Sequence, residues 1–272
     1  MEANTAAIAT AYQVRNEKRT ATAAERESLS LYSGFGGIKE VLDLGTNNPM
    51  PDKMKQALSH LMRILQTVAQ GDETLYKELV DSIKASVLTA FYTPKILIEA
   101  VADQIQATFQ SHGLPMKSFL EPSAGIGGFL PVAMPDTCKA AFEKDLATGL
   151  VLSALQPDTK TVIGGFETID AQELENVKFD VIASNIPFGT INVFDADFER
   201  RGTPYKQSLK AIHNYFFIKA MELLSEGGLL AFVTSRGVAD SPSNRFVRDY
   251  LVHHAHIITA PVSYTHLRAH ET

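Results

Sequence analysis

The chain has 272 residues, of which 45% are hydrophobic and 21% charged, and its formal net charge is −6 at pH 7. Its apolar runs fall short of the roughly 18 residues that a membrane helix requires, so we expect a globular protein with no membrane partner. The negative charge argues against a domain that binds nucleic acid by bulk electrostatics alone, but it leaves local contacts open. With a single cysteine, Cys138, the chain cannot form an internal disulfide or a zinc site built from cysteines. We expect Cys138 to be buried as a small apolar side chain. The start of the chain shows no secretory signal, so we expect a cytoplasmic location.

Residues 1–85 predict a helical annex, a group of helices that precedes the main domain. Residues 1–32 are rich in Ala, Glu, Arg and Thr and favour one or two helices. From residue 51 to about residue 90, apolar side chains recur at helical spacing and predict two amphipathic helices. Between these parts, "LYSGFGG" places three glycines around Phe35. This pattern favours a tightly packed corner, and a backbone segment close to a ligand is the alternative.

After Pro94, which suits the first turn of a helix, the pattern changes from helices alone to alternating strands and helices. Short apolar runs predict strands at residues 119–120, 139–142, 161–163, 179–183, 229–234 and 255–258. Strands separated by helices in this way indicate right-handed crossover units. We therefore expect an α/β domain over residues 86–260, with a mostly parallel sheet and helices on both faces.

A glycine-rich segment, "FLEPSAGIGGFL", follows the first predicted strand; its glycines are Gly125, Gly127 and Gly128. Glycines at this place bring main-chain amides close to a nucleotide-like ligand over the end of the strand. The strict dinucleotide fingerprint is not met, because Leu130 stands where the third glycine belongs, and Glu121 would repel a phosphate. The acidic Glu121-Pro122 entry suits a positively charged cofactor such as S-adenosylmethionine better, and a purely structural turn is the alternative.

The ends of the next two strands offer further cofactor contacts. Glu143 lies about 20 residues beyond the glycine loop, the usual place for a carboxylate that accepts hydrogen bonds from two ribose hydroxyls. A helix cap by Glu143 or Asp145 is the alternative. After the third strand, Phe166 offers a ring for adenine to lie against, with Glu167 as an acceptor. An aromatic residue at a strand end can equally belong to the core.

The fourth predicted strand ends in "SNIPFG", which holds Asn185, Ile186, Pro187 and Phe188 together. An exocyclic amine on a nucleobase is a poor nucleophile, because its lone pair is delocalised into the ring, unless two acceptors hold its hydrogens. The side-chain oxygen of Asn185 and the carbonyl of Ile186, fixed by Pro187, can supply these acceptors. Phe188 can stack on the target ring, which has to flip out of a duplex to be reached. For the motif in isolation, a strand that ends in a plain turn is the alternative.

Three motifs in order resemble those of the adenine-N6-specific DNA methyltransferases. "FLEPSAGIGGF" and "SNIPFG" are similar to the cofactor loop and the catalytic loop of the branch in which the cofactor motif comes first. "AFYTPKILIEAV" resembles the segment that closes over the methionine end of the cofactor, which implies contacts from Phe91, Tyr92 and Thr93. "HNYFFIKAMELLSEGGLLAFVTSRGV" resembles the helix and strand that follow, so the resemblance covers roughly residues 85–260. "LYSGFGG" more weakly resembles the amino-terminal part of large methylase-like proteins of phages and conjugative elements.

The resemblance implies a Rossmann-like class I methyltransferase sheet of the seven-stranded type, which can lack its last strand in this chain. It implies transfer of a methyl group from S-adenosylmethionine to the N6 amine of a flipped-out adenine in DNA, without a metal. Methylation of a protein glutamine amide or of an RNA adenine, and an inactive cofactor-binding or DNA-binding module of a larger mobile-element protein, are the alternatives. The sequence departs from the family at Ile186, where the first of two prolines is usual, and at Gly165, where an acid often stands.

The last segment, "PVSYTHLRAHET" at residues 261–272, has no apolar period and looks like translated sequencing adapter. On this interpretation the natural chain continues, and its target-recognition part is missing here. Five histidines near this end suggest a metal site, which we discount because two of them belong to the tail; they are His253, His254, His256, His266 and His270.

Overall fold

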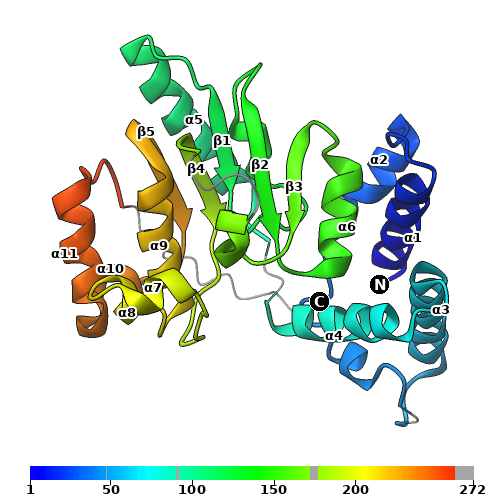
Figure 1. Cartoon of the computed structure of the whole chain (residues 1–272). Helices are drawn as coiled ribbons and strands as arrows, with labels where there is room; N and C mark the ends of the chain where they lie inside the picture. The colour runs from blue at the N-terminus through cyan, green and yellow to red at the C-terminus, as the bar shows by residue number, and fades with distance from the viewer. Residues whose placement is uncertain (47, 90–91, 172–176, 261–272) are drawn as a thin grey trace. The chain divides into compact units, whose positions relative to one another are not determined.

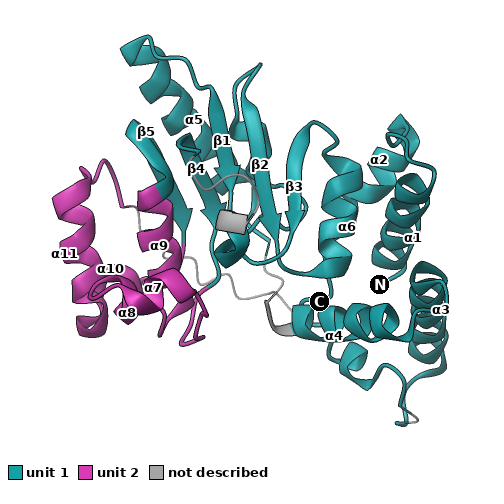
Figure 2. Ribbon diagram, in the orientation of Figure 1, with its two compact units in different colours: residues 1–187, 223–233 teal, residues 188–222, 234–272 magenta. Residues whose placement is uncertain are grey.

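The computed structural model describes residues 1–46, 48–89, 92–171 and 177–260 (Figure 1). Phe91 and the predicted tail at residues 261–272 lie outside the described residues. The chain divides into two compact units, which Figure 2 shows in different colours. Unit 1 comprises Met1–Pro187 and Leu223–Val233, and unit 2 comprises Phe188–Glu222 and the described part of Thr234–Thr272.

Unit 1 contains a five-stranded sheet in which every pairing is parallel, in the order β3-β2-β1-β4-β5 (Figure 1). Its strands are β1 (Ser118–Glu121), β2 (Cys138–Glu143), β3 (Thr159–Ile163), β4 (Phe179–Asn185) and β5 (Leu224–Val233). The predicted α/β class and five of the six predicted strands are confirmed. Cys138 is exposed and not buried as expected, because it is the first residue of β2 and lies before the buried stretch of that strand.

The sixth predicted strand, at residues 255–258, is wrong. In the described part of the chain this segment has no regular structure and joins no sheet. Ile257 and Ile258 are 68% and 60% exposed. A short apolar run becomes a strand only when a neighbouring strand takes up its main-chain hydrogen bonds, and here none does.

Helix α6 (Leu146–Leu155) connects the sheet to the annex. Its sequence, "LATGLVLSAL", is apolar around its whole circumference, which is typical of a helix buried on all sides. Leu152 packs in the cluster that includes Phe119 and Val181 of the sheet, while Leu150 and Val151 pack among the annex helices. Helix α5 (Lys95–His112) buries Ile105 and Phe109 in the sheet cluster.

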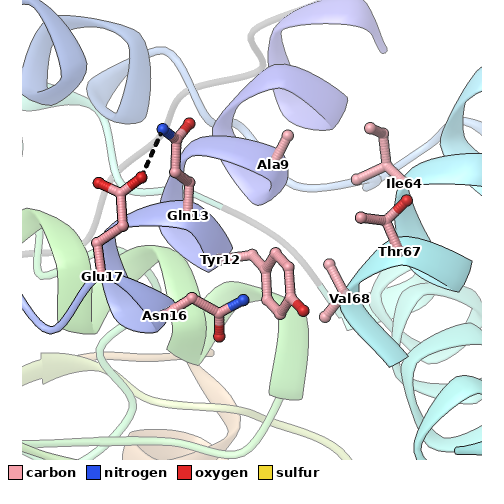
Figure 3. A pocket seen from close by; sticks show the side chains of 8 residues that line it. All are labelled: Ala9, Tyr12, Gln13, Asn16, Glu17, Ile64, Thr67 and Val68. Carbon is pink, nitrogen blue, oxygen red and sulfur yellow. Dashed lines mark hydrogen bonds between the residues drawn. The ribbon is translucent and has the colours of Figure 1, made fainter. Parts of the chain in front are cut away.

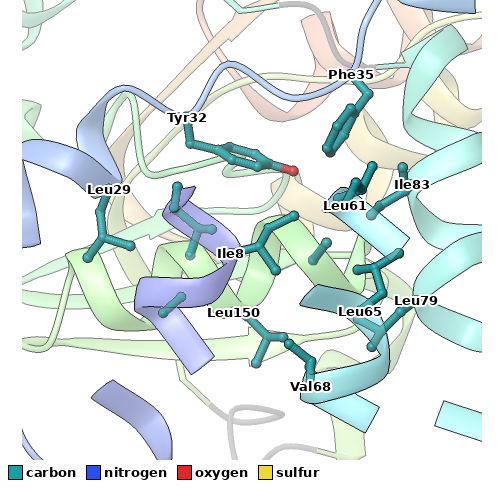
Figure 4. Packing of buried hydrophobic residues seen from close by; sticks show 14 of the residues in the cluster. Ile8, Leu29, Tyr32, Phe35, Leu61, Leu65, Val68, Leu79, Ile83 and Leu150 are labelled. Carbon is teal, nitrogen blue, oxygen red and sulfur yellow. The ribbon is translucent and has the colours of Figure 1, made fainter. Parts of the chain in front are cut away.

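The annex comprises α1 (Glu2–Asn16), α2 (Ala23–Ser30), the short helix η1 (Lys39–Asp43), α3 (Asp52–Ala69) and α4 (Glu73–Thr89). The predicted helices of residues 1–32 and 51–90 are confirmed. Their apolar faces meet α6 in one cluster, of which Figure 4 shows Ile8, Leu61 and Leu150. The boundary expected after residue 85 falls inside α4, and the annex belongs to the same compact unit as the sheet.

The "LYSGFGG" segment forms a packed corner. Phe35 is fully buried, and Gly34 has a φ of +67°, which favours glycine. The buried side chain of Asn4 donates a hydrogen bond to the Gly34 carbonyl and accepts one from the Ser33 N–H at 2.9 Å. The main chain of Ser33 and Gly34 is therefore bonded to Asn4 of the annex and Phe35 is buried, which supports the packed-corner interpretation.

Unit 2 contains α7 (Ala196–Arg200), α8 (Tyr205–Ser208), most of α9 (Ile212–Leu223), α10 (Gly237–Asp240), the short helix η4 (Pro242–Asn244) and α11 (Arg245–His254). At its centre the buried carboxylate of Asp195 caps α7 and accepts a hydrogen bond from the Tyr215 hydroxyl at 2.8 Å. Lys219 pairs with the same carboxylate at 3.3 Å. Among the described helices, none is both long enough and apolar enough to cross a membrane.

Candidate cofactor and catalytic site

The predicted site lies at the carboxyl ends of the central strands. The chain passes through β1, β2 and β3 in one direction across the sheet and then returns to β4 on the other side of β1. In open α/β sheets, ligands bind outside the carboxyl ends of the strands where the order reverses in this way. The Ser184 hydroxyl of β4 donates a hydrogen bond to the Ser123 carbonyl at 2.9 Å. The residue before Asn185 is thus joined directly to the glycine loop.

The glycine loop requires glycine at two positions for different reasons. Gly125 and Gly127 have φ values of +57° and +88°. A Cβ atom at Gly125 would lie 3.4 Å from Cε1 of Tyr92, so the tyrosine of the predicted cofactor segment lies against this loop. A Cβ atom at Gly127 would lie 2.7 Å from Cδ1 of Leu130. Gly127 therefore serves the packing of the loop, whereas Gly125 lies beside the Tyr92 ring.

The rest of the predicted Tyr92 segment is described in part. Tyr92 itself is 41% exposed, and burial, with the nearby carboxylates of Glu143 and Asp145, raises its pKa. Thr93 is partly buried beside it. The structure thus brings Tyr92 to the glycine loop, and its contact with a cofactor stays a prediction.

Glu121 and Pro122 are both buried at the end of β1. Both carboxylate oxygens of Glu121 accept a hydrogen bond from the Phe129 N–H, at 3.0 and 3.2 Å. Burial raises the pKa of Glu121 well above its ordinary value, and the Glu143 carboxylate adds to this. The carboxyl group of Glu121 therefore holds the glycine loop from within, and a direct contact with a cofactor stays a prediction.

Glu143 lies at the end of β2 and is joined to the glycine loop. Its Oε2 atom accepts a hydrogen bond from the Gly125 N–H at 2.7 Å, and its Oε1 atom accepts one from the Asp145 N–H at 2.7 Å. Burial raises the pKa of Glu143 to about 7; the nearby Asp145 carboxylate adds to the rise, and the main-chain hydrogen bonds oppose it. A carboxylate can accept about four hydrogen bonds, so Glu143 retains acceptor capacity.

The capping alternative applies to Asp145 and not to Glu143. Asp145 is the N-cap residue of α6, and its Oδ1 atom accepts a hydrogen bond from the Thr148 N–H at 2.7 Å. The two acids therefore have different structural roles. Asp145 caps the helix, and Glu143 binds the loop.

Phe166 begins the short helix η3 (Phe166–Ala171) after β3 and is 1% exposed. Its ring meets that of Phe142 edge to face, with centroids 6.1 Å apart. The structure thus supports the core alternative for Phe166, and adenine stacking by this ring stays a prediction.

Ile186 is fixed in place by contacts that a proline could not make in full. Asn185 ends β4 opposite Val233 of β5 and is partly buried. The Ile186 N–H donates a hydrogen bond to the Val233 carbonyl at 3.1 Å, and the Ile186 side chain is 1% exposed. Proline has no N–H group to form this bond. Ile186 is therefore held by hydrogen bonding and burial and not by a proline ring, and Pro187 follows it, partly buried.

Phe188 is the first residue of unit 2, and its side chain is 48% exposed. The next residue, Gly189, has a φ of +124°, and its N–H donates a hydrogen bond to Nδ1 of His213 at 3.3 Å. Burial lowers the pKa of His213, which favours the neutral ring that can accept this bond. Sequence reasoning missed His213, because a contact across 24 residues leaves no local pattern.

A separate pocket of about 340 Å³ lies in the annex between α1 and α3 (Figure 3). Within it, the Gln13 amide donates a hydrogen bond to Glu17 at 3.0 Å. None of the residues that line this pocket belongs to the predicted site; they are Ala9, Tyr12, Gln13, Asn16, Glu17, Ile64, Thr67 and Val68.

Residues 139–261 match the profile of the Eco57I restriction-modification methylase family. A segment of 162 residues, 59% of this chain, is 25% identical to "Defense against restriction protein B" of Escherichia phage P1 and covers 7% of that protein. The methyltransferase subunit of a type I restriction-modification system from Streptococcus thermophilus superposes with a TM-score of 0.50 at 16% identity, over 89% of this chain and 58% of the other.

The chain thus spans less than two thirds of the length of each of these relatives. The structural likeness shows a common fold, an α/β fold with a parallel sheet and an amino-terminal helical region. The family match begins in β2 and includes the "SNIPFG" loop. Over residues 139–261, less than half of its length, the chain is therefore similar to the restriction-modification methylases of the Eco57I type.

Proposed function

We propose that this chain transfers a methyl group from S-adenosylmethionine to the exocyclic N6 amine of an adenine that is flipped out of DNA. The observation that carries the proposal is the position of Asn185 and Ile186 at the end of β4, one residue beyond the Ser184–Ser123 hydrogen bond to the glycine loop. Asn185 and Ile186 lie within the segment that matches restriction-modification methylases, which supports DNA as the substrate.

The residues at the strand ends fit S-adenosylmethionine. Gly125 leaves the space that a Cβ atom would fill next to the Tyr92 ring, and Glu143 retains acceptor capacity for ribose hydroxyls. Tyr92, Gly125 and Glu143 would therefore hold the cofactor, with Asn185 at the adjoining strand end. When bound, S-adenosylmethionine would supply the methyl group as an electrophile on a positively charged sulfur. Further contacts stay predictions, namely those from Phe91, Thr93, Glu121, Pro122, Gly127 and Phe166.

The chain's part in the reaction is to hold the adenine amine. One hydrogen of the amine is directed to the side-chain oxygen of Asn185 and the other to the Ile186 carbonyl. Because the Ile186 N–H is bonded to Val233 and its side chain is buried, its carbonyl keeps one direction. Pro187 limits the rotation of the following residue. Two fixed acceptors stabilise the partial positive charge that develops on the amine as it attacks the methyl group.

Phe188 would stack on the face of the flipped adenine. Its side chain is 48% exposed at the position that follows Pro187. The N–H of Gly189, the next residue, donates a hydrogen bond to His213. Stacking on an aromatic side chain is the usual way to retain a base that has left the duplex. A cytoplasmic location and the absence of a membrane partner stay predictions.

One alternative has an observation in its favour. The matched segment covers only 7% of the phage relative, a protein whose name refers to defense against restriction. This chain can therefore be a cofactor-binding or DNA-binding module of a larger mobile-element protein that is inactive without its target-recognition part. RNA adenine and a protein glutamine amide also remain as substrates, because the same pair of acceptors would hold their planar amines.

Two measurements in sequence test the proposal. Isothermal titration with S-adenosylmethionine shows whether the chain binds the cofactor, and a labelled-methyl assay on adenine-rich DNA, RNA and protein extract shows which substrate receives the label. We expect the chain to bind the cofactor and to transfer the label to DNA, from which it is recovered as N6-methyl-2′-deoxyadenosine after digestion. Label in RNA or protein alone would change the substrate, and binding without transfer would favour the inactive module.

A further inference from the structure

The annex contacts the candidate site at the amino-terminal end of α6. Helix α4 packs against α6 (Figure 1), and Ser82 of α4 is hydrogen-bonded to the start of α6. The Ser82 hydroxyl donates a hydrogen bond to Oδ2 of Asp145 and accepts one from the Leu146 N–H at 2.9 Å. Ser82 thus binds both the acid that caps α6 and one of the main-chain donors at the start of that helix.

A second contact from the annex joins the same turn of α6. The Tyr32 hydroxyl lies 3.1 Å from the Thr148 hydroxyl, and Tyr32 is 2% exposed within the annex cluster (Figure 4). The Thr148 N–H in turn donates to Oδ1 of Asp145 at 2.7 Å. Both oxygens of the Asp145 carboxylate therefore accept hydrogen bonds, Oδ2 from Ser82 of the annex and Oδ1 from Thr148 of α6.

Asp145 is joined to the cofactor loop through Glu143. The Asp145 N–H donates to Oε1 of Glu143, and Oε2 of Glu143 accepts from the Gly125 N–H, both at 2.7 Å. A continuous series of hydrogen bonds thus runs from Ser82 through Asp145 and Glu143 to Gly125, entirely within unit 1. We expect Glu143 to bind the ribose of the cofactor and Gly125 to leave room for it.

We infer that the annex is a working part of the cofactor site, and that Ser82 is a positioning residue that sets the orientation of Glu143 through Asp145. The inference rests on the proposed function in one respect, that Glu143 binds the cofactor ribose. It does not depend on which substrate receives the methyl group. Ser82 itself touches no reacting atom, so its effect passes through the main chain of residues 143–146.

The simpler alternative is that Ser82 only caps α6. In that case its hydroxyl would contribute to the stability of the fold and not to cofactor affinity. A capping hydroxyl contributes roughly 1 kcal/mol to stability, so melting temperature alone does not separate the two roles. Affinity for S-adenosylmethionine separates them, because only a positioning residue alters the acceptor geometry of Glu143.

The chain offers a matched control in Ser86, which lies one turn farther along α4. The Ser86 side chain is buried, and its hydroxyl donates a hydrogen bond to the Ile83 carbonyl at 2.7 Å within the same helix. Ser82→Ala and Ser86→Ala thus remove the same group from the same helix. Only the first change removes a contact with Asp145 and Leu146.

The experiment is isothermal titration of the full chain with S-adenosylmethionine, for wild type, Ser82→Ala, Ser82→Thr and Ser86→Ala. We expect Ser82→Ala to weaken binding about tenfold, the scale of one hydrogen bond to a charged group. Ser86→Ala should bind within about twofold of wild type, and Ser82→Thr, which keeps the hydroxyl, should restore most of the affinity. The pH at which binding is half-maximal should also rise in Ser82→Ala, because the loosened Glu143 loses hydrogen bonds that favour its charged form.

Each outcome decides the inference or the proposed function. Equal affinities in wild type and Ser82→Ala, with a lower melting temperature in the variant, would show a cap alone and overturn the inference. If Ser82→Ala does not fold, Tyr32→Phe carries the same test, since it removes only the hydroxyl that meets Thr148. A wild-type chain that binds no S-adenosylmethionine overturns the cofactor assignment and the inference together. Binding that responds to Ser82→Ala without methyl transfer supports the inference and refutes the proposed function.

Discussion

The Ser184 hydroxyl donates a hydrogen bond to the Ser123 carbonyl across the adjoining carboxyl ends of β4 and β1. Ser123 precedes the turn at Gly125–Gly127 by two residues, and Ser184 is followed by Asn185. The group that would hold a target amine is therefore fixed relative to the loop that would hold the cofactor. A methyl transfer needs its two reactants at a defined distance, and this bond ties together the two segments that would set it.

We expect Gly125→Ala to weaken binding of S-adenosylmethionine at least tenfold. Gly125 has a φ of +57°, and the new methyl group would lie 3.4 Å from the Tyr92 ring, in the space that the cofactor would use. The left-handed backbone adds a loss of stability of about 1–2 kcal/mol. Isothermal titration measures the affinity, and thermal unfolding measures the stability.

Gly113 provides the control for the backbone strain in this experiment. It ends α5 with a φ of +62°, and a Cβ atom there would meet no atom within 4 Å. Gly113→Ala should therefore lose similar stability while keeping wild-type affinity. Equal affinities in the two variants would show that Gly125 has no special place in the cofactor site.

Affinity for S-adenosylmethionine should rise with pH around neutrality. Burial raises the pKa of Glu143 to about 7, and only its deprotonated form accepts hydrogen bonds at both oxygens from ribose hydroxyls. Binding should therefore strengthen as the pH increases from 6 to 8. Titrations across this range measure the effect, and Glu143→Gln should bind weakly and with little dependence on pH.

The same shift has the opposite effect on the stability of the cofactor-free protein. Because the pKa of Glu143 in the folded state lies above its ordinary value of 4.5, its contribution to stability is fully present below that value. The contribution is lost as the pH rises through about 7.

For the affinity prediction, a wild-type protein that binds S-adenosylmethionine more weakly at pH 8 than at pH 6 would contradict the role assigned to Glu143.

The sequence predicts those parts of the fold and site that local patterns determine. Helical periodicity locates the annex helices, and the apolar runs locate β1 to β5. The run at residues 255–258 looks the same in sequence but finds no partner strand, because pairing depends on the rest of the fold. Likewise, composition shows neither that Glu121 turns inward to the Phe129 N–H nor that Phe166 packs on Phe142. These side-chain directions follow from tertiary contacts.

The hydrogen bonds that organise the site were equally invisible in the sequence. Ser82 and Asp145 are 63 residues apart, and Ser184 and Ser123 are 61 apart. Serines at such separations carry no motif, so only the folded chain shows that they meet. The motif residues can be named from the sequence, because binding a cofactor and holding an amine restrict the residue types, and their roles stay predictions.

Ile186→Pro should destabilise the protein, although the catalytic loop that this segment resembles usually has proline here. The change removes the hydrogen bond from the Ile186 N–H to the Val233 carbonyl and part of a side chain that is 1% exposed. Together these losses correspond to about 2–4 kcal/mol. Denaturant unfolding measures the change. Ile186→Val keeps the N–H and should cost about 1 kcal/mol, and a proline variant as stable as wild type would show that the bond to Val233 contributes nothing.

Phe188→Ala should reduce methylation of duplex DNA about 10- to 100-fold, the value of one base stacked on an aromatic ring. The side chain is 48% exposed, so its removal should leave the fold and the affinity for S-adenosylmethionine unchanged. Steady-state assays with duplex and single-stranded DNA measure the effect, and Phe188→Tyr, which keeps a ring, should retain most of the activity. Full activity of Phe188→Ala on duplex DNA would exclude the stacking role.

The most direct test of the account is the methyl transfer activity of Asn185→Ala. The assay measures label from S-adenosylmethionine in adenine-rich DNA, with the modified nucleoside identified by mass spectrometry and cofactor affinity measured in parallel. Wild type should produce N6-methyladenine, and the variant should lose at least about 100-fold in turnover, the cost of removing one group that stabilises developing charge. Its affinity for S-adenosylmethionine should stay within a few-fold of wild type. Unchanged turnover in Asn185→Ala, with the same methylated product, would contradict the central claim that this residue holds the target amine.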